Sequence, residues 1–257
     1  MGILNLTPDS FYDGDPLNSV DTHIARVDQM LKEGASIIDL GAVSTRPGAR
    51  DISESEEVDR LMPSLKAIRL NFPDCFISID TFRCSIVQKA VDEGADMIND
   101  IYGGRFDSDM LKIIGQMDIP YILMHMKGTP DTMQQNPEYH DVVAEIAYFF
   151  LQQTEKLREF GARQILLDPG FGFGKTAEHN FEILNRLQEF ETIGFPLVTG
   201  VSRKSFIQRA LGVDAMDALN GSTVLHTLAV LKGVKILRVH DVREAVQVVK
   251  LVESVTG

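Results

Sequence analysis

The chain has 257 residues, 44% of them hydrophobic and 24% charged, and a formal net charge of −12. Affinity for a phosphate backbone comes mainly from Lys and Arg that displace counterions, so this acidic balance argues against a nucleic-acid partner. No apolar run approaches the roughly 18 residues that span a bilayer, and the first residues do not read as a secretion signal. We therefore expect a cytoplasmic protein with no membrane partner. Cys75 and Cys84 lack the spacing of a zinc site or a redox pair, and we expect buried thiols.

Eight short β-rich runs alternate with longer amphipathic stretches along the chain. The runs cover residues 2–6, 36–40, 76–80, 97–101, 121–125, 164–168, 197–201 and 235–240. Helical periodicity is clearest at residues 20–33, 54–71, 85–93 and 141–160. Such alternation is typical of parallel strands joined by helices, and eight units close a (β/α)8 TIM barrel of the α/β class. We expect one domain over residues 1–257, because no Pro- or Ser-rich linker interrupts the series.

A weak internal repeat supports this interpretation. In four units a Gly follows the helix, and a small residue, an apolar strand and a polar residue come next; these glycines are Gly34, Gly94, Gly161 and Gly233. The pattern predicts a left-handed helix cap at each Gly and a buried strand after it.

Polar residues lie at or near the ends of the expected strands. They are Asn5, Asp39, Asp80, Asn99, Asp100, His125, Asp168, Ser202, Arg238 and His240. Because TIM-barrel active sites are built at the carboxyl ends of the strands, we expect these groups to converge on one mouth. Any single one of them is equally well explained as the start of a loop.

The loops after the first two strands, residues 5–15 and 44–50, are long and rich in turn formers. They are suited to closing over a substrate, and Arg46 beside Pro47 is suited to holding a phosphate or carboxylate. Two ordinary turns are the alternative.

The Gly-rich segment 167–176 resembles a phosphate loop only superficially, because Pro169 stands where a Walker A motif needs its first Gly. We expect Phe171 and Phe173 to offer ring faces to a flat ligand and Asp168 to accept from an amino-substituted heterocycle. A turn with two core phenylalanines is the alternative.

The last two strand ends favour an anion site. Strand alternation places Arg238 and His240 on one side, and the loops after strands seven and eight of TIM barrels frequently bind phosphate.

Seven segments, in this order, resemble the dihydropteroate synthase family: GILNLTPDSF from Gly2, STRPGA from Ser44, SIDT from Ser78, INDI from Ile98, DPGFGFGK from Asp168, GVSRKS from Gly200 and RVHDV from Arg238. The resemblance implies a folate-pathway transferase that joins 6-hydroxymethyl-7,8-dihydropterin pyrophosphate to p-aminobenzoate, giving dihydropteroate and pyrophosphate. It also implies Mg²⁺ as cofactor, sensitivity of the site to sulfonamides, and a homodimer.

The resemblance assigns roles to individual residues. It implies that the pterin is held by Asp80, Asn99, Asp168 and Lys204. The pyrophosphate falls to Asn5, Arg238 and His240, with Asn5 also a Mg²⁺ ligand. The p-aminobenzoate is framed by Thr45, Pro47, Phe173 and Ser202. The catalytic residues on this assignment are Asp13, Arg46, Lys204, Arg238 and His240.

These residues suit a dissociative reaction, in which pyrophosphate leaves first and the electron-rich dihydropterin stabilises the resulting cation. Asp13 is the candidate to stabilise that cation or to take up the amine proton. The chain departs from the family pattern at Val43, where a Glu is common, and at Asp15, where a Gly is usual, and the printed sequence begins inside the first motif.

Three other functions compete with this one. The pterin-binding barrel of a folate/corrinoid methyltransferase shares the fold but has no need of the 44–49 loop or of an Arg–His pair for pyrophosphate. A Schiff-base aldolase using Lys204 is disfavoured, because we expect that Lys among polar residues that leave its pKa unchanged. A non-catalytic pterin-binding module is expected to have lost a contact residue, and every assigned position is retained.

Overall fold

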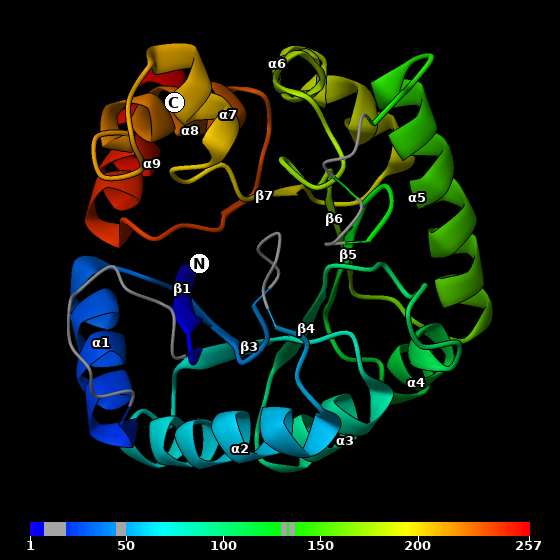
Figure 1. Cartoon of the computed structure of the whole chain (residues 1–257), viewed down its shortest axis with the longest axis vertical. Helices are drawn as coiled ribbons and strands as arrows, with labels where there is room; N and C mark the ends of the chain where they lie inside the picture. The colour runs from blue at the N-terminus through cyan, green and yellow to red at the C-terminus, as the bar shows by residue number, and fades with distance from the viewer. Residues whose placement is uncertain (8–18, 45–49, 130–132, 134–136) are drawn as a thin grey trace.

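The computed structural model describes residues 1–7, 19–44, 50–129, 133 and 137–257. In this part of the chain, strands surround the centre of the molecule and helices lie outside them (Figure 1). The strands are β1 (Gly2–Asn5), β2 (Ile37–Gly41), β3 (Phe76–Asp80), β4 (Met97–Asp100), β5 (Tyr121–Met124), β6 (Ile165–Asp168), β7 (Val198–Thr199) and β8 (Ile236–Leu237).

The helices fill the connections between these strands. They are α1 (Val20–Glu33), α2 (Glu54–Asn71), α3 (Cys84–Asp92), α4 (Met110–Met117), α5 (Val142–Glu159), α6 (Ala177–Asn185), the 3-10 helix η1 (Leu187–Ile193), α7 (Ser205–Leu211), α8 (Leu219–Leu231) and α9 (Val242–Thr256). Among the described helices, none combines the length and apolar character that crossing a membrane requires.

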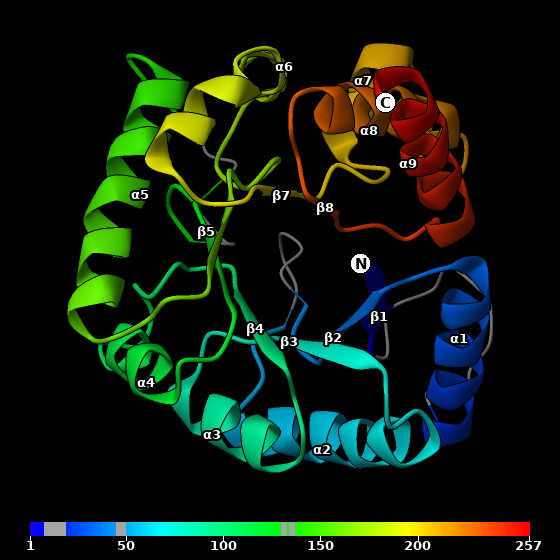
Figure 2. The ribbon, with the colours of Figure 1, turned by 180° about the vertical axis from the view of Figure 1, so that it is seen from behind.

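The strands close into a barrel. Strands β1 to β6 pair in chain order, each parallel to the next, and β7 pairs with β8. Single parallel bridges join the two sheets, from Leu167 to Leu197 and from Gly2 to Val239. Figure 2 shows β1 beside β8 at the second of these junctions. The expected TIM barrel is confirmed, with β7 and β8 shorter than the sequence predicted.

Local signals explain the helix boundaries. The side chain of Ser19 accepts from the Thr22 N–H and begins α1, and Asp141 accepts from the N–H of Val143 and of Ala144 at the start of α5. The four repeat glycines all have positive φ, from 87° to 103°, as the repeat predicted. A side chain would strain the backbone there, which is why the helices end at glycine.

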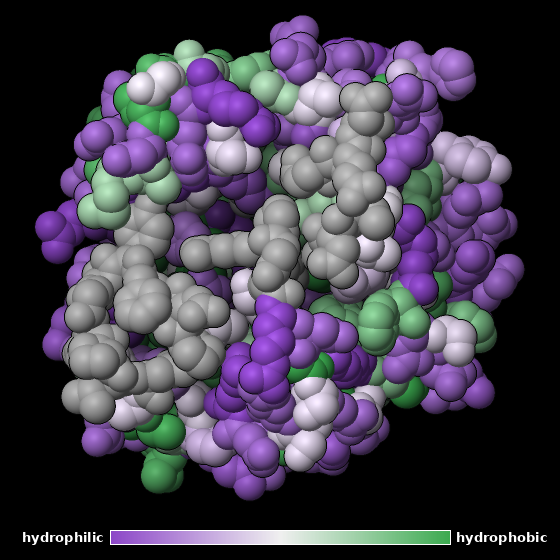
Figure 3. All heavy atoms as spheres, in the orientation of Figure 1, coloured by the Kyte–Doolittle hydropathy of each residue, from purple (hydrophilic) through white to green (hydrophobic). Residues whose placement is uncertain are grey.

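The interior of the barrel is layered. Met97, Ile122 and Val198 form an apolar cluster on the inward side of the strands. The main hydrophobic core lies between the strands and the surrounding helices. The polar groups therefore gather toward the carboxyl ends of the strands, as the barrel architecture requires. The face of the molecule in Figure 3 is mostly hydrophilic where described residues are drawn.

Candidate active site

Strand register brings three of the expected site residues level with one another. The pairing runs from Asn5 to Gly41, from Gly41 to Asp80, and from Asp80 to Asn99. A Cβ at Gly41 would make ordinary van der Waals contact with Asp80, 3.5 Å from its Cβ. The four residues thus form one row across β1 to β4.

Arg238 joins that row from the end of β8, the strand that lies next to β1. Its backbone N–H donates to the Thr199 carbonyl at 2.8 Å, which sets it next to β7. Its Nε lies 2.6 Å from Oδ2 of Asp39, and its Nη2 lies 2.7 Å from Oδ2 of Asp80. The Asn99 amide donates to the same Asp39 oxygen at 3.2 Å. Asp39, which sequence analysis named only as one of the strand-end residues, is therefore a shared partner of this network.

The charges in this network depend on one another. Burial raises the pKa of the Asp80 carboxyl to about 7, although Arg238 acts in the opposite direction. Burial also opposes the charge on Arg238, but Asp39 and Asp80 more than compensate and raise the pKa of its guanidinium. Arg238 is thus a permanent cation, and its charge favours the ionised form of Asp80 against the effect of burial.

The Gly-rich segment supplies a second group of polar atoms. Asp168 ends β6 and accepts from the Gly170 N–H at 2.7 Å. Burial raises the pKa of Asp168, and nearby Lys204 counteracts this effect. The Lys204 ammonium donates to the Phe171 carbonyl and lies 4.5 Å from the centre of the Phe173 ring.

Lys204 does not lie in the setting that the sequence suggested. Burial lowers the pKa of its amine to about 8, against the opposing charge of Asp168. The expectation of polar surroundings that leave this pKa unchanged is therefore wrong. Arg238 also lowers the Lys204 pKa, so the two cations are near enough to interact.

The two phenylalanines of the Gly-rich segment have different surroundings. Phe171 is fully buried and stacks on Phe206 with ring centres 6.3 Å apart. The expectation that it offers a ring face to a ligand is wrong, because the ring belongs to the core. Phe173 is only partly buried and packs against the cluster that contains Met124 and Met126.

Sequence reasoning missed Lys175, the last residue of the same motif. Its side chain is buried, and its ammonium donates to the carbonyls of Gly170 and Phe173, both at 2.9 Å. It also lies 3.1 Å from Nδ1 of His125. Burial lowers the pKa of Lys175 well below its ordinary value. The residue holds the loop beneath Phe173 in shape, a role that a search for phosphate contacts does not reveal.

Two strand-end residues do not join the network of Asp39, Asp80 and Arg238. Asp100 accepts from the Tyr121 hydroxyl at 2.6 Å and from the Gly104 N–H at 2.7 Å. His125 packs against Phe149 and approaches Lys175. The prediction that every strand-end polar group converges on one mouth is wrong for these two, which support neighbouring loops instead.

His240, expected at the anion site, lies against the neighbouring loop that carries Ser202. The His240 N–H donates to Oγ of Ser202 at 3.3 Å, which joins the loops after β8 and β7. Strand β8 ends at Leu237, so strand alternation no longer determines where Arg238 and His240 point. The expected residues Asp13, Thr45, Arg46 and Pro47 lie outside the described residues.

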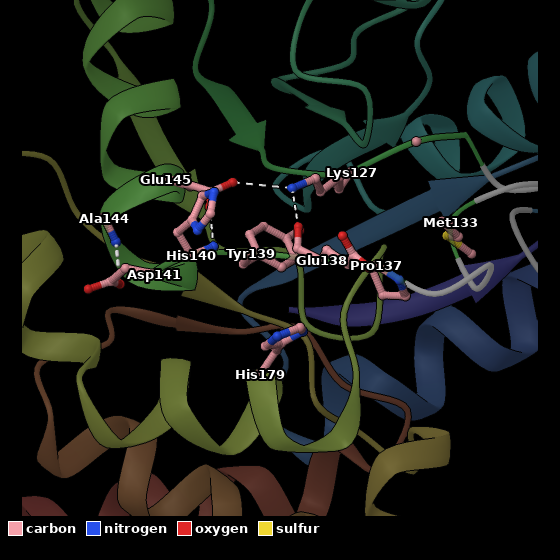
Figure 4. Close-up of a pocket in the computed structure, with 11 residues that line it drawn as sticks. Lys127, Met133, Pro137, Glu138, Tyr139, His140, Asp141, Ala144, Glu145 and His179 are labelled. Atoms are coloured by element: carbon pink, nitrogen blue, oxygen red, sulfur yellow. Dashed lines mark hydrogen bonds and ion pairs between the residues drawn. The ribbon is translucent and has the colours of Figure 1, made fainter.

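A cavity of about 1090 Å³ opens beside this region, at the loop between β5 and α5. Its lining includes Lys127, Tyr139, Glu145 and His179 (Figure 4). Two of these residues pair directly, with Nζ of Lys127 pointing toward Oε2 of Glu145 at 3.2 Å. Within the described part of the chain, the lining contains none of the expected site residues. The cavity is therefore separate from the candidate site.

The donor atoms limit what kind of metal the site can hold. The described residues contain no group of three or more His, Cys, Asp or Glu arranged to bind a metal ion. Mg²⁺ is often held by one or two protein oxygens together with substrate phosphates, whereas structural zinc needs a full set of protein ligands. A single amide oxygen such as that of Asn5 fits the first case.

Comparisons with known proteins identify the family of this chain. Residues 1–240 match the family described as "Pterin binding enzyme". The chain is 44% identical to the dihydropteroate synthase of Synechocystis over 257 residues, which cover 99% of this chain and 89% of the relative.

Solved structures of dihydropteroate synthases also resemble the chain in fold and sequence. A Yersinia pestis dihydropteroate synthase with a sulfonamide drug complex superposes with a TM-score of 0.94 at 39% identity, over 99% of this chain and 92% of that one. A Xanthomonas albilineans dihydropteroate synthase with 4-aminobenzoic acid gives 0.92 at 35% identity, over 100% and 92%. The chain therefore belongs to the dihydropteroate synthase family, transferases of folate biosynthesis.

Proposed function

We propose that the chain condenses 6-hydroxymethyl-7,8-dihydropterin pyrophosphate with p-aminobenzoate by a dissociative route, at the mouth formed by Asp39, Asp80, Asn99 and Arg238. The observation that carries this proposal is the shared contact of Arg238 with two carboxylates from different strands. This contact places hydrogen-bond acceptors for a heterocycle beside a cation that can bind an anionic group.

Acceptor atoms in the mouth match the N–H groups of a pterin. Oδ1 of Asp39 is buried and has no hydrogen-bond partner among the described residues. A buried acceptor without a partner is costly, and a ligand donor would satisfy it. Asp80, Asn99 and Asp168 add further acceptors, and Lys204 adds a donor. We assign the pterin ring to this group.

The pyrophosphate is assigned to Asn5, Arg238 and His240. Arg238 is charged at every relevant pH and stabilises the negative charge that develops as the C–O bond to pyrophosphate breaks. Asn5 at the end of β1 would hold Mg²⁺ through its amide oxygen. When bound, Mg²⁺ neutralises phosphate charge and so makes pyrophosphate a better leaving group.

The p-aminobenzoate is assigned to Thr45, Pro47, Phe173 and Ser202, consistent with the 4-aminobenzoic acid bound by the Xanthomonas relative. Its amine attacks the exocyclic methylene carbon of the dihydropterin, the new C–N bond replaces the C–O bond, and the amine proton leaves. An aryl amine is unprotonated at neutral pH, so positioning and exclusion of water carry the reaction. We assign uptake of the proton, or stabilisation of the cation, to Asp13, and completion of the site to Arg46.

We also propose that residues 1–257 form one domain and that two copies form a homodimer. The bridge between Gly2 and Val239 supports one domain, because the first and last strands then share one sheet edge. Val224, Leu228 and Leu231 support the dimer, because they form an exposed apolar stripe on α8.

The test is release of pyrophosphate from the pterin substrate, measured with and without p-aminobenzoate and Mg²⁺. We expect release that requires Mg²⁺, and dihydropteroate formation when p-aminobenzoate is present. Asn5→Ala is expected to need more Mg²⁺ for the same rate. Asn71→Ala serves as the control, because Asn71 lies at the end of α2 and bonds only its own helix in the described contacts. Absence of release under all conditions would support a non-catalytic pterin-binding module instead.

A further inference from the structure

Arg203 lies between Ser202 and Lys204, two expected site residues, and both its side chain and its backbone form hydrogen bonds with neighbouring segments. Its Nη1 donates to the carbonyls of Ala215 at 2.8 Å and Met216 at 2.5 Å. Its backbone N–H donates to Oγ of Ser222 at 2.8 Å, and its carbonyl accepts from Gln208. Its φ is 52°, a left-handed conformation that only strong surrounding contacts maintain in a residue with a side chain.

The main partner of Arg203 is Asp241, the residue after His240. Nε and Nη2 of Arg203 donate to the two carboxylate oxygens of Asp241 at 2.8 and 2.9 Å. This bidentate contact fixes the orientation of the guanidinium relative to the carboxylate. The side chains are 12% and 19% exposed, so solvent screens the pair only partly. The contact ties the loop after β7 to the loop after β8.

We propose that the Arg203–Asp241 ion pair is a positioning device that holds the His240 backbone against Ser202 and thereby positions His240 in the pyrophosphate half of the active site. This inference rests on the proposed function. Ser202 and His240 flank the pair and share the 3.3 Å contact between the two loops. Without the pair, relaxation of the left-handed backbone at Arg203 shifts Ser202 away from His240.

The pterin half of the site is held by other contacts. Lys204 also adjoins Arg203, but its ammonium is fastened to the Phe171 carbonyl and lies over the Phe173 ring. Asp39 and Asp80 are held by Arg238. Loss of the Arg203–Asp241 pair should therefore weaken recognition of the pyrophosphate far more than recognition of the ring.

The test compares the dissociation constants of two ligands, the pterin pyrophosphate and the corresponding 6-hydroxymethyl alcohol, by calorimetry in the presence of Mg²⁺. The variants are Arg203→Lys, which keeps the charge and loses the bidentate contact, and Asp241→Asn, which keeps the shape and loses the charge. We expect the pyrophosphate ligand to bind about tenfold more weakly in each, and the alcohol to change by less than about twofold.

A matched ion pair at the other end of the barrel provides the control. Arg69 lies 2.6 Å from Asp96, which precedes β4, and Arg69 also donates to backbone carbonyls, as Arg203 does. The Arg69 and Asp96 side chains are 24% and 35% exposed. Asp96→Asn should lower the unfolding temperature, as Asp241→Asn does, and leave both dissociation constants unchanged.

The sign of the effect separates positioning from charge. If the pair acted only through charge, Asp241→Asn would expose a cation beside the anion site and strengthen pyrophosphate binding, and Arg203→Lys would resemble the wild type. Either result overturns the inference, and so does equal weakening of both ligands. A wild-type protein that binds the two ligands equally would instead refute the pyrophosphate site of the proposed function.

Discussion

Arg238 and Asp39 are 199 positions apart in the chain, yet they form an ion pair inside the barrel, with Nε 2.6 Å from Oδ2. The Asp39 side chain is fully buried and that of Arg238 is 21% exposed. The guanidinium therefore compensates a charge that has no access to water. Because it also contacts Asp80, the same side chain organises two carboxylates that reach it from separate strands.

Arg238→Ala should lower the free energy of unfolding by about 3–5 kcal/mol, because it leaves buried carboxylates without their cation. Urea unfolding at pH 7.5 measures this change. Adding Asp39→Asn to Arg238→Ala should recover part of the lost stability without restoring turnover, because the buried charge disappears together with its partner. A single variant as stable as the wild type would contradict the compensating role of Arg238.

The pH profile of kcat/KM for the pterin substrate should fall as the pH rises through about 8, the pKa to which burial lowers the Lys204 amine. The ammonium exists below that pH and the neutral amine above it, so the charge is lost on the alkaline side. In Lys204→Arg the fall should move to higher pH, because a guanidinium does not titrate in this range. Lys32→Arg, at an exposed position on α1, should keep the wild-type profile. An unshifted profile in Lys204→Arg would assign the titration to another group.

Asp13→Ala and Arg46→Ala should each lower turnover by about 100-fold or more and change the dissociation constant of the pterin pyrophosphate far less. We assign these side chains to steps after the pterin is bound, so rapid-quench kinetics should show the loss in the chemical step. Asp15→Ala, two positions after Asp13 in the sequence, is the control and should keep most of its turnover. Unchanged turnover in both Asp13→Ala and Arg46→Ala would refute assembly of the site by the two loops.

Leu228→Glu should convert the proposed dimer into a monomer, because it places a charge in the middle of the apolar stripe on α8. Sedimentation velocity measures the change. Leu70→Glu is the matched control, since Leu70 is 83% exposed at the end of α2, outside the α8 stripe. A Leu228→Glu protein that sediments like the wild type would exclude this face as the interface.

The sequence predicted the secondary structure closely where local signals are strong. The boundaries of α1 and α2 agree with the structure, because Ser19 and Ser53 cap the two helices and amphipathic periodicity defines their length. Strands β7 and β8 came out shorter than expected. Their ladder is irregular, as the N–H groups of Lys235 and Ile236 both donate to the Leu197 carbonyl. Two N–H groups share one carbonyl only because of how the two strands pack together, so the sequence of neither strand predicts it.

For the candidate site, the sequence predicted which residues take part but not how they contact one another. Motifs at strand ends predicted Asp80, Asn99, Asp168 and Arg238 as members of one mouth. They did not distinguish Phe173, which is partly exposed, from Phe171, which packs in the core. Nor did they show that burial alters the pKa of Lys204 or that Lys175 holds the Gly-rich loop.

The sequence by itself determined the order of strands and helices and the residue types at each strand end, because periodicity, caps and turn formers act over a few neighbouring positions. Only the tertiary structure decided which of these groups form ion pairs and which are shielded from water. Arg238 finds Asp39 and Asp80 only after the barrel closes, and both the strength of an ion pair and the pKa of a buried amine depend on what water has been excluded around them.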